Sequence, residues 1–246
     1  MPLRFSRMPV LLLFCAVLFW SAHNVVAKGL IVSVPPFSFT FVRWLVAALI
    51  LLPFTWRHIR QDWPEVRRNW KRLLLIATLG ICAFNTLLYV AVQTTTATNV
   101  GVISSIFPAM IALFSLLILK IRLSRVQVTG MFISFLGVIL VILRGELATI
   151  TGLVFVEGDL WMVLAIVFGA MYPVLLHNKP AIHPLSLLTV LIIFGALASL
   201  PLYLLDQIQG RFIIMNPDVI SGLVFVSLFP SVLSYLFWNR GIELIG

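Results

Sequence analysis

Eight long apolar stretches run through this sequence of 246 residues and constrain its fold more than any other feature. Each is long enough to cross about 30 Å of hydrocarbon as a helix. None alternates apolar with polar residues, as the strands of a membrane barrel would. Hydrophobic residues make up 61% of the chain and charged residues only 10%. The sequence therefore predicts an all-α integral membrane protein with spans over residues 10–31, 37–56, 73–92, 100–119, 126–143, 160–176, 185–205 and 219–237.

The lysine and arginine residues lie mostly on one side of these spans. Thirteen of the 17 share a side with the N-terminus, whereas Arg144 and Arg211 lie opposite, and Lys28 and Arg43 lie inside spans. Short cytoplasmic loops carry such an excess of positive charge. We therefore expect a multi-pass protein of the cell inner (plasma) membrane with a cytoplasmic N-terminus.

This orientation predicts the side of the membrane on which two of the loops lie. The basic segment 57–72 is expected to be a solvated cytoplasmic loop that rests on anionic headgroups, and the segment 144–159 is expected outside. A cysteine at Thr149 should accordingly be labelled from outside and a cysteine at Gln61 should not. Since topology explains the formal charge of +9, the charge gives no reason to expect a nucleic-acid partner.

The chain contains an internal repeat. Residues 36–53, PFSFTFVRWLVAALILLP, align with residues 184–201, PLSLLTVLIIFGALASLP, with seven identities that include a proline at each end. The same offset of 148 carries the first three spans onto the last three. A repeat of five spans enters the membrane inverted in its second copy, as in many secondary transporters. We expect a first repeat at 1–147 with five helices and a second at 148–246 with three.

The repeat also predicts where further helices would lie. The fourth and fifth spans of the second copy would fall at about 248–267 and 274–291, beyond Gly246. Ten helices are expected of the architecture and about eight of this chain. On this interpretation a completing partner chain, or a second copy in a homo-oligomer, would cover the faces left open.

Sequence motifs of enzymes do not stand out. We find no phosphate-binding loop, no H-E-x-x-H and no G-x-S-x-G. Cys15 and Cys82 lie within spans and are interpreted as structural cysteines. We therefore expect no catalytic residue, no cofactor and no metal site, and we predict a protein that is not an enzyme.

Polar residues inside the apolar helices are the candidates for function, because they are expensive there. Trp20, His23, Asn24 and Lys28 lie within about half the circumference of the first helix. They either line a substrate pathway, with His23 as a proton carrier, or bond to neighbouring helices while Lys28 reaches the outer rim. Arg43 has Leu191 as its counterpart in the second copy, and it requires carbonyls or an anionic ligand.

Two later helices carry similar polar stripes. Asn85 and Tyr89 lie one turn apart, and a similar stripe with spacings of three and four residues contains Ser231, Ser234, Tyr235 and Trp238. These residues either line the pathway or serve helix packing and the interfacial aromatic belt. The segment 94–108, TTTATNVGVISSIFP, favours close helix packing, with a hinge at Pro108 as the alternative.

The sequence resembles the EamA-like branch of the drug/metabolite transporter superfamily. The likeness rests on WSAHNVVAKGL, on PPFSFTFVRWLVAALILLP and on LLYVAVQTTTATNVGVISSIFPAMIALFSLLIL, and it extends over essentially the whole chain. Family features that match are Trp20, Lys28, Arg43 and the segment 94–108. The chain departs from the family at Ile121, where a glutamate is usual.

The resemblance implies ten helices in two inverted five-helix repeats that export or exchange small metabolites. We therefore expect a secondary transporter of a small organic metabolite, embedded in the lipid bilayer and working by alternating access. A truncated, transport-inactive paralogue or a scaffold that needs a partner chain is the alternative.

Overall fold

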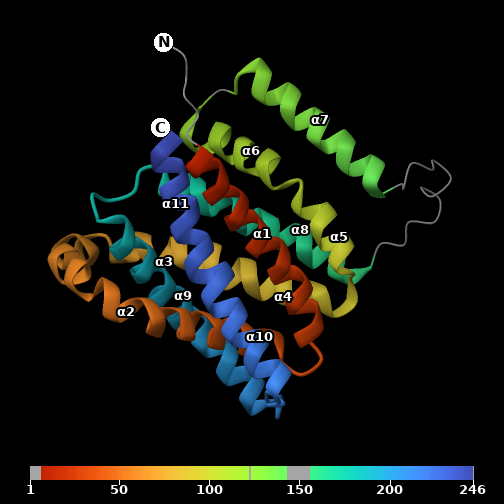
Figure 1. Cartoon of the computed structure of the whole chain (residues 1–246), viewed down its shortest axis with the longest axis vertical. Helices are drawn as coiled ribbons and strands as arrows, with labels where there is room; N and C mark the ends of the chain where they lie inside the picture. Colours follow the sequence, from red (N-terminus) through yellow and green to blue (C-terminus); the bar gives the residue numbers. More distant parts are fainter. Residues whose placement is uncertain (1–6, 122, 143–155, 246) are drawn as a thin grey trace.

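The computed structural model describes residues 7–121, 123–142 and 156–245, and all regular structure in these ranges is helical. The helices lie side by side as a bundle (Figure 1). Their bounds in chain order are α1 (Arg7–Leu30), α2 (Pro36–Arg68), α3 (Trp70–Ala77), the π-helix η1 (Thr78–Ala83), α4 (Phe84–Thr94), α5 (Ala97–Ser104), α6 (Phe107–Leu119), α7 (Arg125–Ile142), α8 (Glu157–Leu176), α9 (Pro184–Ile208), α10 (Pro217–Leu228), the π-helix η3 (Phe229–Leu233) and α11 (Ser234–Ile245).

Seven helical units in the described ranges are long and apolar enough to cross a membrane, which confirms the all-α membrane fold. Three of them combine elements: α3 with η1 and α4, α5 with α6, and α10 with η3 and α11. The remaining expected span, 126–143, coincides with α7 as far as Ile142. This helix lies at the edge of the bundle beyond α6 (Figure 1). Residue 143, most of the expected outer loop with Thr149, and the expected repeat boundary at 147/148 lie outside the described residues.

The prediction of a loop at 57–72 is wrong. Helix α2 continues for three turns beyond its apolar part to Arg68, and α3 begins after a single residue, Asn69. The Asn69 side chain donates to the Glu65 carbonyl, and Arg68 forms an ion pair with the Glu65 carboxylate. Because glutamate, glutamine and arginine favour helices, the polar segment extends the helix where the hydrophobic pattern had ended.

The helix bounds recur at the offset of the sequence repeat. Pro36 begins α2 and Pro184, 148 residues later, begins α9, and both prolines occupy the first helical turn, where a proline costs nothing. The third unit of each half carries a π-helix, η1 in one and η3 in the other. π-Helices are rare and often mark functional sites. The recurrence therefore includes an irregular feature as well as the start of a helix.

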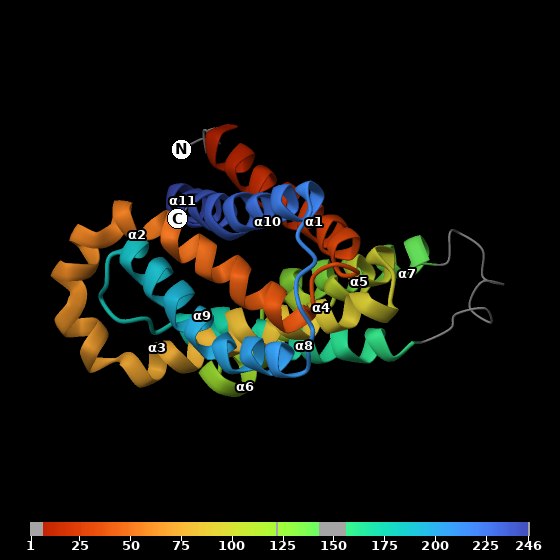
Figure 2. The same cartoon turned by 90° about the horizontal axis from the view of Figure 1, so that it is seen from below.

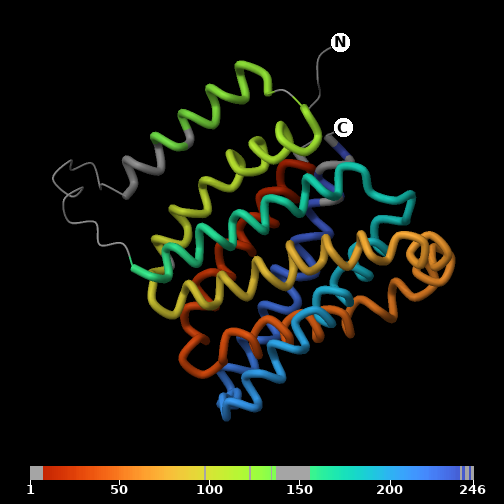
Figure 3. Tube along the Cα trace, turned by 180° about the vertical axis from the view of Figure 1, so that it is seen from behind, coloured from red at the N-terminus to blue at the C-terminus, as the bar shows by residue number. Residues whose placement is uncertain are grey.

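The two sets of helices interlock. Helix α2 makes its most extensive contact with α9, and the two lie against each other in Figure 2. Helix α1 runs along α11 (Figure 1), and α8 lies between α4 and α6 when the bundle is seen from behind (Figure 3). Trp44 and Tyr89, both fully buried, belong to the two hydrophobic clusters that hold this arrangement. Apolar side chains that remain exposed, such as Phe14 and Val25, are suited to contact lipid.

The segment 94–108 contains a break between helices. Helix α5 ends at Ser104 and α6 begins at Phe107, directly before Pro108. The Ser104 hydroxyl donates to the Val100 carbonyl, and the Ser105 hydroxyl likewise donates to a carbonyl of α5. Serine side chains thus satisfy carbonyl groups near the break, as expected of hydroxyl residues in apolar helices.

Candidate functional site

The strongest candidate site is centred on Arg43, whose side chain is buried at 2% exposure about 10 Å along α2 from its first residue. Its Nε donates to Ser231 Oγ on η3 at 2.6 Å. Its Nη1 lies 2.9 Å from Asn85 Oδ1 and 2.7 Å from the Tyr89 hydroxyl, both on α4. The same Nη1 lies 2.8 Å from His23 Nε2 on α1. One guanidinium therefore joins helices from both halves of the chain.

The protonation of this cluster follows from hydrogen-bond chemistry. Arginine only donates, so His23 Nε2 has to be the acceptor of the Arg43 contact. The Tyr89 hydroxyl lies 2.8 Å from the same His23 nitrogen and accepts from Arg43; if it also donates to His23, it shares the single Nε2 lone pair with Arg43. Asn85 and Ser231 are neutral as well. The cluster consequently holds one positive charge among neutral partners.

Second hydrogen bonds orient two of these partners. Asn85 Nδ2 donates to the Ile81 carbonyl within η1, and Ser231 Oγ donates to the Val226 carbonyl five residues earlier. Ile81 lies within the π-helix η1, whereas Val226 lies near the end of α10 and its bond partner Ser231 lies within the π-helix η3. Each π-helix, η1 and η3, thus helps to orient one hydrogen-bond partner of the Arg43 side chain, Asn85 and Ser231 respectively.

No carboxylate balances the Arg43 charge within 4.0 Å, as far as the described residues extend. Its Nη2 donates no hydrogen bond to a described residue. The guanidinium carbon lies 4.6 Å from the centre of the Trp44 ring, which provides a cation–π contact. A charged group in a membrane helix normally pairs or marks a pathway for a ligand or ion. This arrangement suits a ligand that carries a negative charge.

Four of the ten predicted site residues meet in this cluster: His23, Arg43, Asn85 and Tyr89. Three others form an adjoining aromatic group, in which the Trp20 ring lies 5.6 Å from Tyr235 and 5.3 Å from Trp238. Tyr235 also meets the Trp44 ring edge to face at 6.2 Å. The aromatic group is therefore connected to the Arg43 cluster through Trp44.

The remaining three predicted residues lie elsewhere. Lys28 Nζ donates to the carbonyls of Val92 and Thr95 at the end of α4, at 2.6 and 2.8 Å. Ser234 Oγ bonds to the Ala16 carbonyl of α1, which is a helix-packing contact. Asn24 is half-buried and makes no side-chain hydrogen bond to a described residue. A pathway role for all ten residues stays a prediction.

The sequence search did not include two residues that the structure brings forward. Trp44 supports the guanidinium, but a tryptophan in an apolar run carries no distinguishing pattern. Asp206 is fully buried in the last turn of α9, one residue beyond the apolar stretch that had been assigned as a span. A search that extended each span by one turn would have found Asp206.

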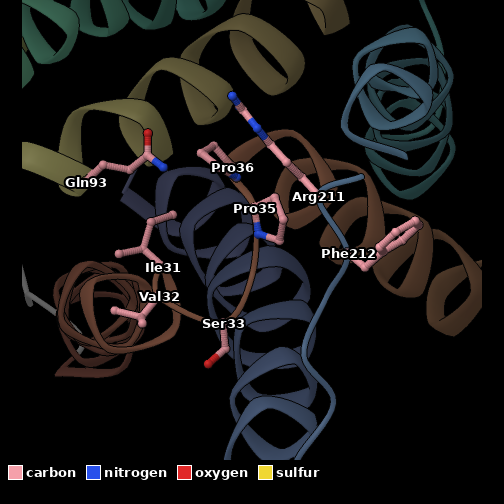
Figure 4. Close-up of a pocket in the computed structure, with 8 residues that line it drawn as sticks. All are labelled: Ile31, Val32, Ser33, Pro35, Pro36, Gln93, Arg211 and Phe212. Carbon is pink, nitrogen blue, oxygen red and sulfur yellow. The ribbon is translucent and has the colours of Figure 1, made fainter. Parts of the chain in front are cut away.

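A surface pocket of about 340 Å³ opens near the start of α2 (Figure 4). The Arg211 side chain extends past Pro35 and Pro36 toward α4, the helix that carries Gln93 (Figure 4). The other lining residues are Ile31, Val32, Ser33 and Phe212. None of the residues that line this pocket belongs to the Arg43 cluster.

The chain is similar in sequence to a known family and to several known proteins. The chain matches the EamA-like transporter family over residues 7–143 and 156–246. It is 33% identical over 200 residues to the uncharacterized transporter YyaM of Bacillus subtilis, a match that covers 80% of this chain and 64% of YyaM. An uncharacterized transporter of Archaeoglobus fulgidus is 26% identical over 235 residues, which cover 93% of this chain and 78% of the relative.

The fold also has a counterpart among solved structures. A protein whose title reads only "Crystal structure of protein" superimposes with a TM-score of 0.67 at 21% identity. The superposition covers 96% of this chain and 79% of that one. The family match spans nearly all of the chain, and the helices described above fit it. The chain therefore belongs to the EamA-like transporter family of the drug/metabolite transporter superfamily, and it is a multi-pass membrane protein.

Proposed function

We propose that this protein is a secondary transporter that exports or exchanges a small organic metabolite with a negatively charged group. The observation that carries the proposal is the Arg43 cluster, in which a buried cation on α2 has neutral partners on α1, α4 and η3. A carboxylate or phosphate that binds Arg43 Nη2 would supply the missing counter-charge, because the two N–H groups of Nη2 have no acceptor among the described residues. The neighbouring aromatic rings Trp20, Tyr235 and Trp238 would accommodate an organic body.

Alternating access follows naturally from the same arrangement. The helix bounds recur at the sequence offset, so we assign residues 1–147 and 148–246 to two inverted repeats. Arg43 belongs to the first repeat and Ser231 to the second, and their hydrogen bond crosses between them. Rocking of one repeat against the other would break or rebuild this contact and expose a bound ligand to alternate sides. The surrounding membrane is taken to be the inner (plasma) membrane.

Counterflow into proteoliposomes tests the transport proposal. Vesicles that contain the purified full chain are preloaded with one metabolite and offered the labelled form outside, across a panel of carboxylates, phosphate esters, amines and neutral sugars. We expect accumulation for members with a carboxylate or phosphate, because only these balance Arg43. Accumulation confined to amines would contradict the proposed charge of the substrate. Failure of every member, with protein that remains folded, would favour a protein without transport activity.

The orientation can be tested by cysteine labelling in cells. Cys15 and Cys82 are first replaced by serine, and a single cysteine is then placed at Gln61 or at Met215, both exposed. With a cytoplasmic N-terminus, an impermeant thiol reagent should modify the cysteine at Met215 and spare the one at Gln61. The reverse pattern would contradict the proposed topology.

A further inference from the structure

A buried carboxylate joins α9 to the beginning of α2. Asp206, with no exposed surface, lies in the last turn of α9. Its Oδ2 accepts from the Ser38 backbone N–H at 2.8 Å and from the Ser38 hydroxyl at 3.0 Å. Ser38 is in the first turn of α2, where backbone N–H groups have no partner within the helix. The negative charge of Asp206 therefore satisfies an otherwise unpaired N–H at the positive end of the α2 dipole.

The second oxygen of the same carboxylate is unsatisfied. Asp206 Oδ1 is buried and has no hydrogen-bond partner within the described part of the chain. No lysine, arginine or histidine nitrogen lies within 4.0 Å of the carboxylate among the residues that the structure describes. An ionised carboxylate in an apolar environment without a counter-charge is costly. Oδ1 is thus an acceptor without a donor, and the addition of a proton there would remove the buried charge.

Asp159 provides a comparison within the same molecule. It is buried at 5% exposure in the first turn of α8. Its Oδ1 accepts from the Thr95 hydroxyl and from Asn99 Nδ2, and its Oδ2 accepts from the Val156 N–H. Both oxygens of Asp159 are therefore satisfied in the ionised form. Of these two buried carboxylates, only Asp206 has an oxygen without a hydrogen-bond partner among the described residues.

The charged side chains that follow α9, on α2 and at the start of α10 do not pair with Asp206. On its own side, Arg211 follows α9 and donates its backbone N–H to the Asp206 carbonyl, while its side chain lines the surface pocket. On α2 the next charged group is Arg43, which is held by its own four partners. On α10 it is Asp218, exposed in the first turn. None of them forms an ion pair with Asp206.

A surface pocket lies beside the segments that form this contact. The pocket is lined by Pro35, by Pro36, which shares the first turn of α2 with Ser38, and by Arg211, which bonds to Asp206 through its backbone (Figure 4). With a cytoplasmic N-terminus this pocket opens on the outer side. This pocket is the route that we infer for protons from the outer solution.

The pseudo-equivalent position at the other end of the same two helices differs. The offset of 148 pairs Ser38 with Ser186 and Asp206 with His58. The Ser186 hydroxyl is buried and has no partner, and His58 instead stacks on His183 at 4.1 Å. The carboxylate–serine contact therefore exists at one end of the α2–α9 pair only.

We propose that Asp206 is a proton-binding site and that its protonation loosens the contact between α9 and the first turn of α2. The proton adds to Oδ1, an O–H bond forms, and the carboxyl passes from charge −1 to neutral. Hydrogen bonds to a neutral acceptor are weaker than those to a charged one, and the attraction to the α2 dipole is lost. Under the transport function proposed above, on which this step rests, the proton from the outer side is the coupling ion.

Infrared difference spectroscopy of the purified full chain tests the proton site without a substrate. Acidification of wild-type protein should produce the C=O band of a protonated, buried carboxyl, and Asp206→Asn should remove that band. Asp159→Asn is the matched control and should retain it, because Asp159 is satisfied as an anion. If the Asn variant does not fold, a shifted band in Asp206→Glu makes the same assignment. A band that persists in folded Asp206→Asn, or none in wild type, would overturn the proposal.

Amide hydrogen exchange at Ser38 tests the structural consequence. After correction for the intrinsic effect of pH, exchange should rise about tenfold on acidification, the change expected when a hydrogen bond to a charged group is lost. Asp206→Asn should show the faster exchange at every pH, and Asp159→Asn should follow wild type. Exchange that is independent of pH in all three proteins would refute the loosening. Both measurements are made without transport, so failure of the transport proposal leaves their outcome interpretable.

Discussion

Replacement of Arg43 by leucine is expected to lower metabolite flux in proteoliposomes by at least about 10- to 100-fold while the protein remains folded, because hydrogen bonds to charged groups contribute about 1.5–3 kcal/mol. Leucine occupies position 191 of α9, which the sequence offset of 148 pairs with Arg43, so its volume is compatible with a helix of this kind. The partners also keep other bonds: Asn85 to Ile81, Ser231 to Val226, and Tyr89 to His23. The variant therefore removes the charge without leaving its partners wholly unpaired.

Two further variants separate charge from structure. Arg43→Lys keeps the positive charge but cannot reproduce the planar fork, so partial flux is expected. Arg72→Leu is the matched control, since Arg72 bonds to the Leu175 carbonyl outside the cluster. It should retain transport. Unchanged flux in Arg43→Leu would remove the proposed substrate role, and loss of monodisperse protein would instead assign Arg43 to the fold.

Replacement of Gly158 by alanine is expected to cause the largest loss of stability from a single methyl group. Gly158 lies in the first turn of α8, where this helix meets the end of α4. A Cβ at this position would approach Thr94 Oγ1 to 2.6 Å and the Thr95 backbone nitrogen to 2.9 Å, and the Ala91 carbonyl oxygen more closely still. Because backbone atoms cannot turn aside, the helices have to separate. Overpacking of this kind costs about 1–3 kcal/mol or more.

The measurement is the midpoint of thermal unfolding in detergent together with the yield of monodisperse protein. Gly101→Ala is the matched control, since Gly101 lies within α5 and an added Cβ there would meet nothing within 4 Å. This control should equal or slightly exceed wild type, because alanine favours the helix more than glycine does. Equal midpoints for the two variants would mean that α4 and α8 do not approach as closely as described.

The sequence alone was sufficient for the helical membrane fold. Long apolar stretches without alternating polarity cross lipid as α-helices, because a helix bonds all of its backbone polar groups internally. The same cost singled out Arg43, His23, Asn85 and Tyr89 as unusual residues before their contacts were known. Repetition of a proline-bounded segment also located the start of α9 from that of α2. These features are local or periodic, so they can be recognised from the sequence without knowledge of the tertiary structure.

Only the tertiary structure showed which polar residues meet. His23 and Lys28 share one helix face in the sequence pattern, yet His23 reaches Arg43 and Lys28 reaches the end of α4. Ser38 and Asp206 are 168 residues apart and bond directly. Such contacts depend on how far each helix extends and which face it turns inward, and both are set by close packing between helices. Hydropathy measures the cost of burying a polar group, whereas its partner is chosen by the geometry of the whole bundle.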